Sequence, residues 1–364
     1  MKPSRNKKRA ARGSGRDAGS RAVAPGGGGK RKPDMLRGSS GEPAAVQDRQ
    51  AVLTGQRPRP AFRQGEPPAE RLPVILEVTP DKNYALLDSG DGEKLERFGE
   101  YRVVRPEGQA IWPRALPQSD WENVDAVFTG DTDEEGLGRW RFPRGPLGET
   151  WPMRHDRIDY LGRFTSFRHV GVFPEQASHW RHMEGLIRNA GRPVKVLNLF
   201  GYTGLASLVA AEAGAEVTHV DASKKAIGWA RKNQAIAGLE NRPIRWICED
   251  AMRFAEREVR RGSHYDIILL DPPAFGRGPK GEVWQVFEDL PAMVELCRDI
   301  LTKNPLAIVL TAYSIRASFF ATHALLRGAM AGRGGIVESG ELVIREQSAG
   351  RALSTSLFSR WVAQ

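Results

Sequence analysis

Three short apolar runs in the second half of the chain each end at residues that could bind a ligand. The first run ends at Gly201 and Gly204, the second at Asp221, and the third at Asp271, which two prolines follow. A glycine turn that opens a helix offers free backbone N–H groups and a positive dipole end to a carboxylate or a phosphate. An aspartate about twenty residues further on can accept hydrogen bonds from ribose hydroxyls. The pattern therefore predicts a site for a nucleoside-containing ligand.

The spacing of the glycines narrows the choice of ligand. A dinucleotide fold would have Gly-x-Gly-x-x-Gly after the strand, and a phosphate-binding loop would close on Gly-Lys-Ser/Thr. The sequence has Gly201-x-x-Gly204 instead, followed by the Ala- and Leu-rich segment 205–213, which predicts a helix. Glycine suits such a turn because a Cβ would block close approach of the backbone to a ligand. Neither alternative motif therefore follows the first strand.

The elements that position these residues are strands alternating with helices. The strands expected from apolar runs are 194–200, 216–220, 244–247, 265–270 and 306–311. The strand expected over 244–247 leads to Asp250, which could receive an adenine amino group. Taken singly, the glycine turn could be a packing feature, Asp221 a helix N-cap and Asp271 a strand end. Because all of them follow strands, and ligands of open α/β sheets bind at the carboxyl ends of strands, together they favour a binding site.

With these motifs in this order, the chain from about residue 165 onward resembles the class I S-adenosylmethionine-dependent methyltransferases. More narrowly, it resembles the bacterial large-subunit ribosomal RNA methyltransferases that act on cytosine carbon 5 and guanine nitrogen 7. The motifs that carry the resemblance are Gly171-Val-Phe-Pro-Glu-Gln176, Asn198-Leu-Phe-Gly-Tyr-Thr-Gly204, Asp221-Ala-Ser223, Glu249-Asp250-Ala251 and Asp271-Pro-Pro-Ala-Phe275. Each motif is weak alone, and their order is specific.

The resemblance implies a cofactor, S-adenosyl-L-methionine, and a set of site residues. The residues implied for cofactor binding are Phe173, Glu175, Gln176, Asn198, Phe200, Gly201, Tyr202, Thr203, Gly204, Asp221, Ala222, Asp250, Ala251 and Asp271. Those implied for catalysis are Asp271, Pro272, Pro273 and Phe275. No spacing of His, Cys or carboxylate residues predicts a metal site.

The target atom is predicted from the motif that begins at Asp271. Asp-Pro-Pro-Ala-Phe resembles the (Asp/Asn)-Pro-Pro-(Tyr/Phe) signature of nitrogen methyltransferases, with the aromatic residue displaced by one position. By that resemblance Asp271 and the Pro272 carbonyl accept N–H hydrogen bonds, and Phe275 stacks on a base that has left its helix. Methylation at cytosine carbon 5 requires a cysteine thiolate, which related enzymes carry at the end of the fifth strand. Here that position reads Ala312-Tyr313-Ser314, so a base nitrogen is the predicted target.

The two cysteines agree with this view. Cys248 lies beside the expected adenine site and Cys297 within an expected helix, 290–301, so both are interpreted as buried structural thiols. Two cysteines give no disulfide framework and no zinc cluster. A reducing cytoplasm is the expected compartment, and no apolar run reaches the ~20 residues that span a bilayer.

Charge is concentrated at the N-terminus. Residues 1–71 hold 17 Lys and Arg against 6 Asp and Glu, a net charge of +11, which leaves about −1 for the rest of the chain. This tail lacks hydrophobic periodicity and is expected to be disordered. Basic arms commonly bind nucleic acid, which agrees with RNA, specifically ribosomal RNA or a ribosomal subunit, as partner. A solubilising extension is the alternative.

Residues 72–164 predict a small β-rich domain with a possible role in substrate recognition. It has short β-prone runs, such as Val74–Val78 and Tyr84–Leu87, separated by turn signals. Its aromatic and basic residues could form a surface for bases and phosphates, or the aromatics could be the core of the domain. These residues are Trp112, Trp121, Trp140, Trp151, Arg139, Arg141, Arg144 and Arg154.

The C-terminal part completes the expected fold. Residues 276–284 predict a loop rich in glycine and charge, in which Arg277, Lys280 and Glu282 could contact substrate. Ile336–Glu338, Leu342–Arg345 and Leu357–Val362 predict a terminal antiparallel hairpin. The predicted fold is α/β: a seven-stranded Rossmann-like methyltransferase sheet over residues 165–364, after the small domain and the tail.

The predicted function is methylation of RNA at a base nitrogen. Two alternatives stay open. One is a methyltransferase of the same fold that acts on protein or a small molecule. The other is a non-catalytic RNA-binding protein with a relic cofactor pocket.

Overall fold

A computed structural model describes residues 63–130, 138–313, 315 and 317–364. Most of the predicted basic tail, residues 1–62, lies outside the described residues, as does Ser314. The last residues assigned to the tail do not belong to it, because residues 69–71 begin a strand. Among the described residues, no helix is long and apolar enough to cross a membrane.

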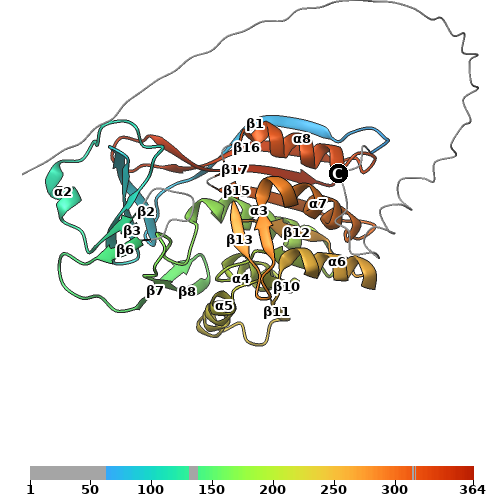
Figure 1. Cartoon of the computed structure of the whole chain (residues 1–364), viewed down its shortest axis with the longest axis horizontal. Helices are drawn as coiled ribbons and strands as arrows, with labels where there is room; N and C mark the ends of the chain where they lie inside the picture. The colour runs from blue at the N-terminus through green and yellow to red at the C-terminus, as the bar shows by residue number, and fades with distance from the viewer. Residues whose placement is uncertain (1–62, 131–137, 314, 316) are drawn as a thin grey trace, which may run out of the picture. The chain divides into compact units, whose positions relative to one another are not determined.

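One large sheet organises the second half of the chain and includes one strand from the first half (Figure 1). It has eight strands. In sheet order the strands are β1 (Ala69–Val78), β16 (Ile336–Arg345), β17 (Ala352–Val362), β15 (Ala307–Tyr313), β12 (Ile267–Leu270), β9 (Lys195–Leu199), β10 (Glu216–Asp221) and β11 (Ile244–Cys248). The five strands from β15 to β11 are parallel, and β17 runs antiparallel to both of its neighbours. The five parallel strands are those expected from the apolar runs, so they bring the predicted motifs to one edge of the sheet.

The strand count is eight rather than seven because β1 joins the sheet. The sequence assigned residues 72–78 to the small domain, but β1 pairs in parallel with β16 at the sheet edge. The register places Val74 opposite Gly340, with a shift in β1 between Arg71 and Val74. The domain boundary at residue 72 therefore falls inside a strand of the large sheet.

The pairing with β1 also explains why Gly340 does not end a strand. Ile336–Glu338 and Leu342–Arg345 were predicted as separate runs, and the structure joins them into β16. A Cβ at Gly340 would lie 1.8 Å from the carbonyl oxygen of Val74. Glycine occupies this position because another backbone approaches closely, which is a common reason for a glycine inside a strand.

Gly340→Ala is expected to lower the free energy of unfolding by about 1–3 kcal/mol, since β1 must move to admit the methyl group. Gly328→Ala is the matched control, because Gly328 lies in helix α8 (Phe319–Ala329) with open space where its Cβ would be. That control should be stabilising by about 0.5–1 kcal/mol. Chemical denaturation of both variants measures the effect; equal stability of Gly340→Ala and the wild type would show that β1 is not held against β16.

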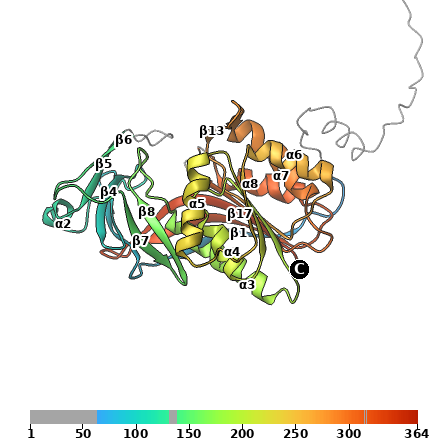
Figure 2. The same ribbon diagram turned by 90° about the horizontal axis from the view of Figure 1, so that it is seen from below.

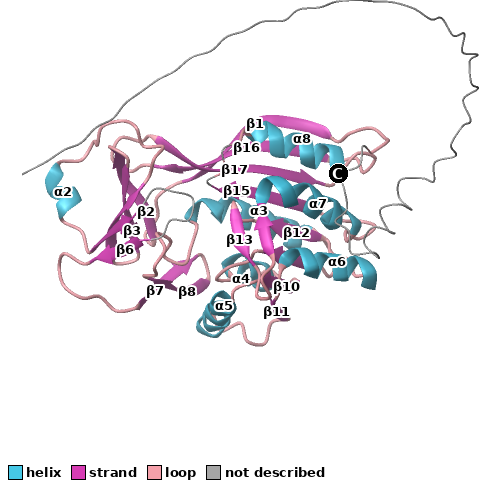
Figure 3. Cartoon of the chain, in the orientation of Figure 1, coloured by secondary structure: helices cyan, strands magenta, loops and turns pink. Residues whose placement is uncertain are grey.

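Helices cover both faces of the sheet (Figures 1 and 3). Alternate residues of a parallel strand point to opposite faces, and Val196 and Leu197 of β9 belong to different core clusters. The first cluster includes residues of α3 (Ala177–Asn189) and α4 (Leu205–Glu212). The second includes residues of α6 (Ala251–Arg261), α7 (Val286–Asp299) and α8. Helix α5 (Lys224–Ile236) contacts β10 and β11.

The β-rich region between residues 84 and 163 is built on its own sheets, within the same compact unit as the large sheet. Its elements are β2 (Tyr84–Gly90), β3 (Glu93–Phe98), β4 (Tyr101–Pro106), α2 (Gln118–Glu122), β5 (Ala126–Gly130), β6 (Gly138–Arg141), β7 (Thr150–His155) and β8 (Ile158–Arg163). Strands β2–β6 form one sheet and β7–β8 another, as Figure 2 shows.

The tryptophans of this region are core residues rather than a binding surface. Trp121 and Trp151 are buried, and Trp112 and Trp140 are partly buried against the first core cluster. Each of Trp112, Trp121 and Trp140 donates its indole N–H to a nearby protein oxygen. The sequence allowed either a surface for bases or a domain core for these tryptophans, and the structure places them in the core.

The predicted loop 276–284 is a β-hairpin. Strands β13 (Phe275–Arg277) and β14 (Val283–Gln285) pair antiparallel, outside the large sheet. Trp284 is buried between exposed Val283 and Gln285, which is the alternation expected of a strand. The glycine-rich sequence around it had indicated a loop instead. The hairpin leads directly into α7, which begins earlier than the expected helix 290–301.

Candidate cofactor and active site

The glycine turn joins β9 to α4 as predicted. Its glycines are required because neighbouring side chains of the protein leave no room for a Cβ. A Cβ at Gly201 would lie 2.4 Å from the His219 imidazole, and one at Gly204 would lie 2.9 Å from the Ala230 side chain. Gly204 has φ +85° and is the N-cap of α4. Close packing of strand, turn and helix therefore fixes both glycines, and it holds the turn at the carboxyl edge of the sheet.

Asp221 ties this turn to the end of β10. Its Oδ2 accepts the backbone N–H of Tyr202 at 2.9 Å, and its Oδ1 accepts that of Ser223 at 2.7 Å. Burial raises the pKa of Asp221, and these two hydrogen bonds oppose that shift. Because each carboxylate oxygen has two lone pairs, both can accept a further hydrogen bond.

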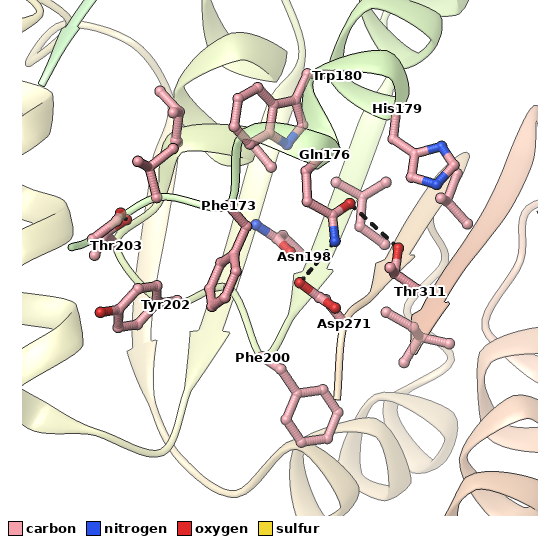
Figure 4. A pocket seen from close by; sticks show the side chains of 18 residues that line it. Phe173, Gln176, His179, Trp180, Asn198, Phe200, Tyr202, Thr203, Asp271 and Thr311 are labelled. Carbon is pink, nitrogen blue, oxygen red and sulfur yellow. Dashed lines mark hydrogen bonds between the residues drawn. The ribbon is translucent and has the colours of Figure 1, made fainter. Parts of the chain in front are cut away.

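A cavity of about 70 Å³ lies at the carboxyl ends of β9, β12 and β15, under α3 (Figure 4). Eight residues predicted to bind cofactor line it: Phe173, Gln176, Asn198, Phe200, Gly201, Tyr202, Thr203 and Asp271. Those that do not line it are Glu175, Gly204, Asp221, Ala222, Asp250, Ala251, Pro272, Pro273 and Phe275. The structure thus brings about half of the predicted residues to one cavity.

Asp250 and Glu175 have other partners in the structure. Asp250 is the N-cap of α6, and its Oδ1 accepts the N–H of Arg253 at 3.0 Å. Glu175, in the short helix η1 (Pro174–Gln176), is only 4% exposed, and burial raises its pKa while Lys94 and Arg105 lower it. Neither residue lines the cavity.

Lys94 and Arg105 belong to a buried ionic cluster that the β-rich region contributes beside the site. Lys94 pairs with Glu107 at 3.0 Å, and Arg105 pairs with Glu96 at 2.7 Å. Arg105 also donates to the backbone oxygen of Arg168 at 2.9 Å. The region is therefore joined to the segment that leads into η1.

Asp271 also lines the cavity, and Gln176 of η1 holds its side chain. The Gln176 Nε2 donates to Asp271 Oδ2 at 3.0 Å, and Thr311 Oγ1 donates to Gln176 Oε1 at 3.3 Å (Figure 4). Burial and, to a smaller extent, the nearby Glu175 raise the pKa of Asp271 to about 7. A carboxyl group with that pKa can exchange a proton near neutral pH.

The Asp-Pro-Pro segment continues into the β13–β14 hairpin. The Trp284 indole N–H donates to the Pro273 carbonyl at 2.8 Å, and its ring lies 4.8 Å from that of Phe200. Phe275 is 45% exposed on β13 and does not line the cavity. The sequence placed Phe275 on the target base, whereas the aromatic residues of the cavity wall are Phe173, Trp180, Phe200 and Tyr202.

Sequence reasoning missed His179 and Thr311 as cavity residues. His179 is 2% exposed, and neither of its ring nitrogens has a hydrogen-bond partner among the described residues. Burial lowers its pKa to about 3, so the ring is neutral at pH 7. The helical spacing from Gln176 to His179 and Trp180 is the signal that could have found it, since residues three and four apart share a helix face.

The cysteines lie away from this cavity. Cys297 is buried in α7, and burial raises its pKa. Cys248 is exposed, which corrects the prediction that it is buried, because it ends β11, the edge strand of the sheet. Tyr313 is the described residue at the end of β15, where the sequence comparison placed a cysteine in carbon methyltransferases.

A larger hollow of about 870 Å³ lies at the opposite edge of the sheet, against the first residues of β9, β10 and β11. Its size alone does not make it the active site, because ligands of open α/β sheets bind at the carboxyl ends. No group of three or more His, Cys, Asp or Glu residues among those described could hold a metal ion.

The parallel sheet, its single antiparallel strand β17 and the cradle at its carboxyl edge define a nucleoside-binding α/β enzyme of the methyltransferase type. The S-adenosylmethionine-dependent methyltransferase from Agrobacterium tumefaciens, a solved structure, is 62% identical with a TM-score of 0.82 over 84% of this chain and 98% of that one. The chain therefore belongs to the S-adenosylmethionine-dependent methyltransferases, and its cofactor is S-adenosylmethionine.

Two further comparisons concern parts of the chain. Residues 180–291 match the family model described as Conserved hypothetical protein 95. Ribosomal RNA large subunit methyltransferases K/L are 29% identical over 163 residues in Syntrophotalea carbinolica and 41% over 138 residues in Cellvibrio japonicus. These matches cover 44% and 38% of this chain but only 22% and 17% of those proteins. The chain thus spans about a fifth of the length of these curated relatives.

Proposed function

We propose that this methyltransferase acts on RNA, specifically ribosomal RNA, and that it methylates a base nitrogen. The observation that carries the target atom is the position of Asp271, whose carboxylate forms the cavity wall and is held there by Gln176. RNA as substrate is supported by the partial similarity to ribosomal RNA methyltransferases. Such a substrate would place the reaction in the cytoplasm.

The cofactor would lie across the carboxyl ends of β9, β10 and β11. In this arrangement Asp221 accepts the ribose hydroxyls with the lone pairs that Tyr202 and Ser223 leave free. Asp250 keeps one oxygen for an adenine amino group, because Arg253 occupies only the other. The glycine turn and the residues Phe173, Asn198 and Thr203 would enclose the end that carries the sulfur.

When bound, S-adenosylmethionine supplies an electrophilic methyl group on sulfur. The protein must hold the acceptor nitrogen in line with that carbon at near van der Waals contact. Asp271 and the Pro272 carbonyl would accept the N–H bonds of the target base and so orient its lone pair. An N–H nitrogen that accepts the methyl group carries one proton too many, and the Asp271 carboxylate would accept that proton. A pKa of about 7 suits this acceptor.

Carbon-5 methylation has no support among the described residues. It requires a cysteine thiolate beside the base, and Ala312 and Tyr313 stand at the end of β15. Buried Cys297 and edge-strand Cys248 do not line the cavity. A base nitrogen is therefore the proposed target.

We expect His179 to contact the amino-acid end of the cofactor. A buried polar group without a partner costs about 1–3 kcal/mol, and a polar group of the ligand entering the cavity would remove that cost. His179→Phe should therefore weaken binding of S-adenosylhomocysteine about tenfold, and leave 5′-methylthioadenosine, which lacks the amino acid, unaffected. Isothermal titration calorimetry with both ligands measures the difference.

His182→Ala is the matched control for this experiment. His182 lies one turn further along α3, also has a lowered pKa, and does not line the cavity. Its variant should bind both ligands like the wild type. Equal weakening of both ligands by His179→Phe would show a general loss of the pocket and contradict the assignment.

Transfer of tritiated methyl groups from S-adenosylmethionine tests the proposed function. The acceptors are deproteinised ribosomal RNA, intact ribosomal subunits and RNA-free protein from the same cells, followed by nucleoside digestion. Label in an N-methylated nucleoside supports the proposal. Label only in protein would identify a protein methyltransferase instead, and label in a carbon-methylated nucleoside would contradict the role of Asp271.

A further inference from the structure

The hairpin that follows the Asp-Pro-Pro segment has two different faces. Residues on one face of a β ladder alternate with those on the other. Trp284 points inward and is buried, whereas Phe275, Arg277, Val283 and Gln285 are exposed. Phe275 pairs with Gln285 and Arg277 with Val283, so these four side chains share the outer face.

The inner face fixes the hairpin to the active site. The Trp284 indole N–H bonds to the Pro273 carbonyl at 2.8 Å, and the Trp284 ring packs on Phe200 of the cavity wall. The Val286 N–H also donates to the Ala274 carbonyl at 3.0 Å. The outer face is thus presented at a fixed place, four residues from Asp271 and at most about 14 Å from it along the chain.

The outer face combines an exposed aromatic ring with unpaired positive charge. Phe275 and Val283 are 45% and 41% exposed, and the Arg277 guanidinium carbon lies 5.8 Å from the centre of the Phe275 ring. Among the described residues no carboxylate forms a salt bridge with Arg277 or Lys280, while Glu282 of the turn is paired with Arg253 at 2.9 Å. The free charge of the hairpin is therefore positive.

An exposed ring beside an arginine is the arrangement on which unpaired bases stack while the cation meets the phosphate. We propose that the outer face of the hairpin binds an unpaired nucleotide of the RNA next to the target nucleotide. This inference rests on the proposed RNA substrate. It assigns Phe275 to a flanking base, because the ring stands outside the cavity in which Asp271 would hold the target base.

Fluorescence anisotropy with a labelled 12-nucleotide single-stranded uridine RNA tests the inference, using the full chain saturated with S-adenosylhomocysteine. Phe275→Ala should weaken binding about tenfold, as expected for one stacked base, and Phe275→Trp should retain it. Arg277→Gln should also reduce the slope of log affinity against log salt by about 0.7. Ile236→Ala is the matched control, because Ile236 is also 45% exposed but ends α5 at the opposite edge of the sheet.

Each outcome decides a different point. Weakening by Phe275→Ala with rescue by Phe275→Trp and no effect of Ile236→Ala supports the stacking surface. Unchanged binding by Phe275→Ala and Arg277→Gln overturns it, while the RNA substrate stands. An equal loss of affinity of Phe275→Ala for a 12-base-pair duplex RNA also overturns the inference, since paired bases cannot stack on the Phe275 ring. Absence of RNA binding by the wild type overturns the inference and the RNA substrate together.

Discussion

The Asp271→Asn enzyme is expected to transfer methyl groups about 100-fold more slowly than the wild type, a loss typical of removing one group that meets charge in the transition state. The amide keeps the shape of the side chain, but it is a poor proton acceptor and presents an N–H where the base requires an acceptor. Single-turnover kinetics with labelled cofactor measures the change. Binding of S-adenosylhomocysteine should stay within a few-fold of the wild type.

The pH profile gives this prediction a second readout. Because the pKa of Asp271 is raised to about 7, its carboxylate is protonated below that pH and available above it. Wild-type turnover should rise as the pH increases through 7 and then level off, whereas the Asp271→Asn profile should be flat over that range. Retention of the wild-type rate by Asp271→Asn would remove Asp271 from the reaction.

Asp221→Ala is expected to weaken the affinity for S-adenosylhomocysteine by about 1–3 kcal/mol. The substitution removes the proposed acceptor for the ribose hydroxyls, and it leaves the N–H groups of Tyr202 and Ser223 without their present partner. Isothermal titration calorimetry measures the affinity, and unchanged affinity would place the ribose elsewhere.

Ser223→Ala separates ribose binding from damage to the helix end. The Ser223 side chain caps α5 by accepting the N–H of Ala226, while its backbone N–H serves Asp221. Its loss should cost about 1 kcal/mol of stability and leave the cofactor affinity close to that of the wild type. If Ser223→Ala bound S-adenosylhomocysteine as weakly as Asp221→Ala, both losses of affinity would come from damage to the start of α5.

The sequence was sufficient to predict the five parallel strands and the residues that follow them, because the pattern that marks them is local. Apolar runs mark the parallel strands because both faces of the sheet are covered, and residues after such runs fall at the carboxyl edge. Asn198, Gly201 and Asp271 are therefore gathered at one cavity, as the motif order indicated. Which residues of the motifs contact ligand stays a prediction.

Nonlocal pairing explains most of what sequence reasoning missed. The run 74–78 was identified as a strand, but its partner, β16, lies some 260 residues later in the chain. The sequence divides β16 into two runs around Gly340, because the reason for this glycine, the nearby Val74 backbone, comes from that distant partner. The β13–β14 hairpin was hidden because its strands have three residues each, too few to show a period.

His179 illustrates a different limit. Its helical position was visible in the sequence. Its unpartnered nitrogens, however, depend on the cavity that α3 lines together with residues of β12 and β15. A histidine on an apolar helix face is usually a core residue, and only the structure shows that this one borders a cavity.

The most direct test of the central claim is a comparison of modified nucleosides in ribosomal RNA from cells that lack this protein and from cells that carry it. Mass spectrometry should show one N-methylated nucleoside missing from the deletion strain, restored by the wild-type gene and not by Asp271→Asn. An identical nucleoside profile in all strains, or loss of a carbon-methylated nucleoside, would contradict methylation of ribosomal RNA at a base nitrogen.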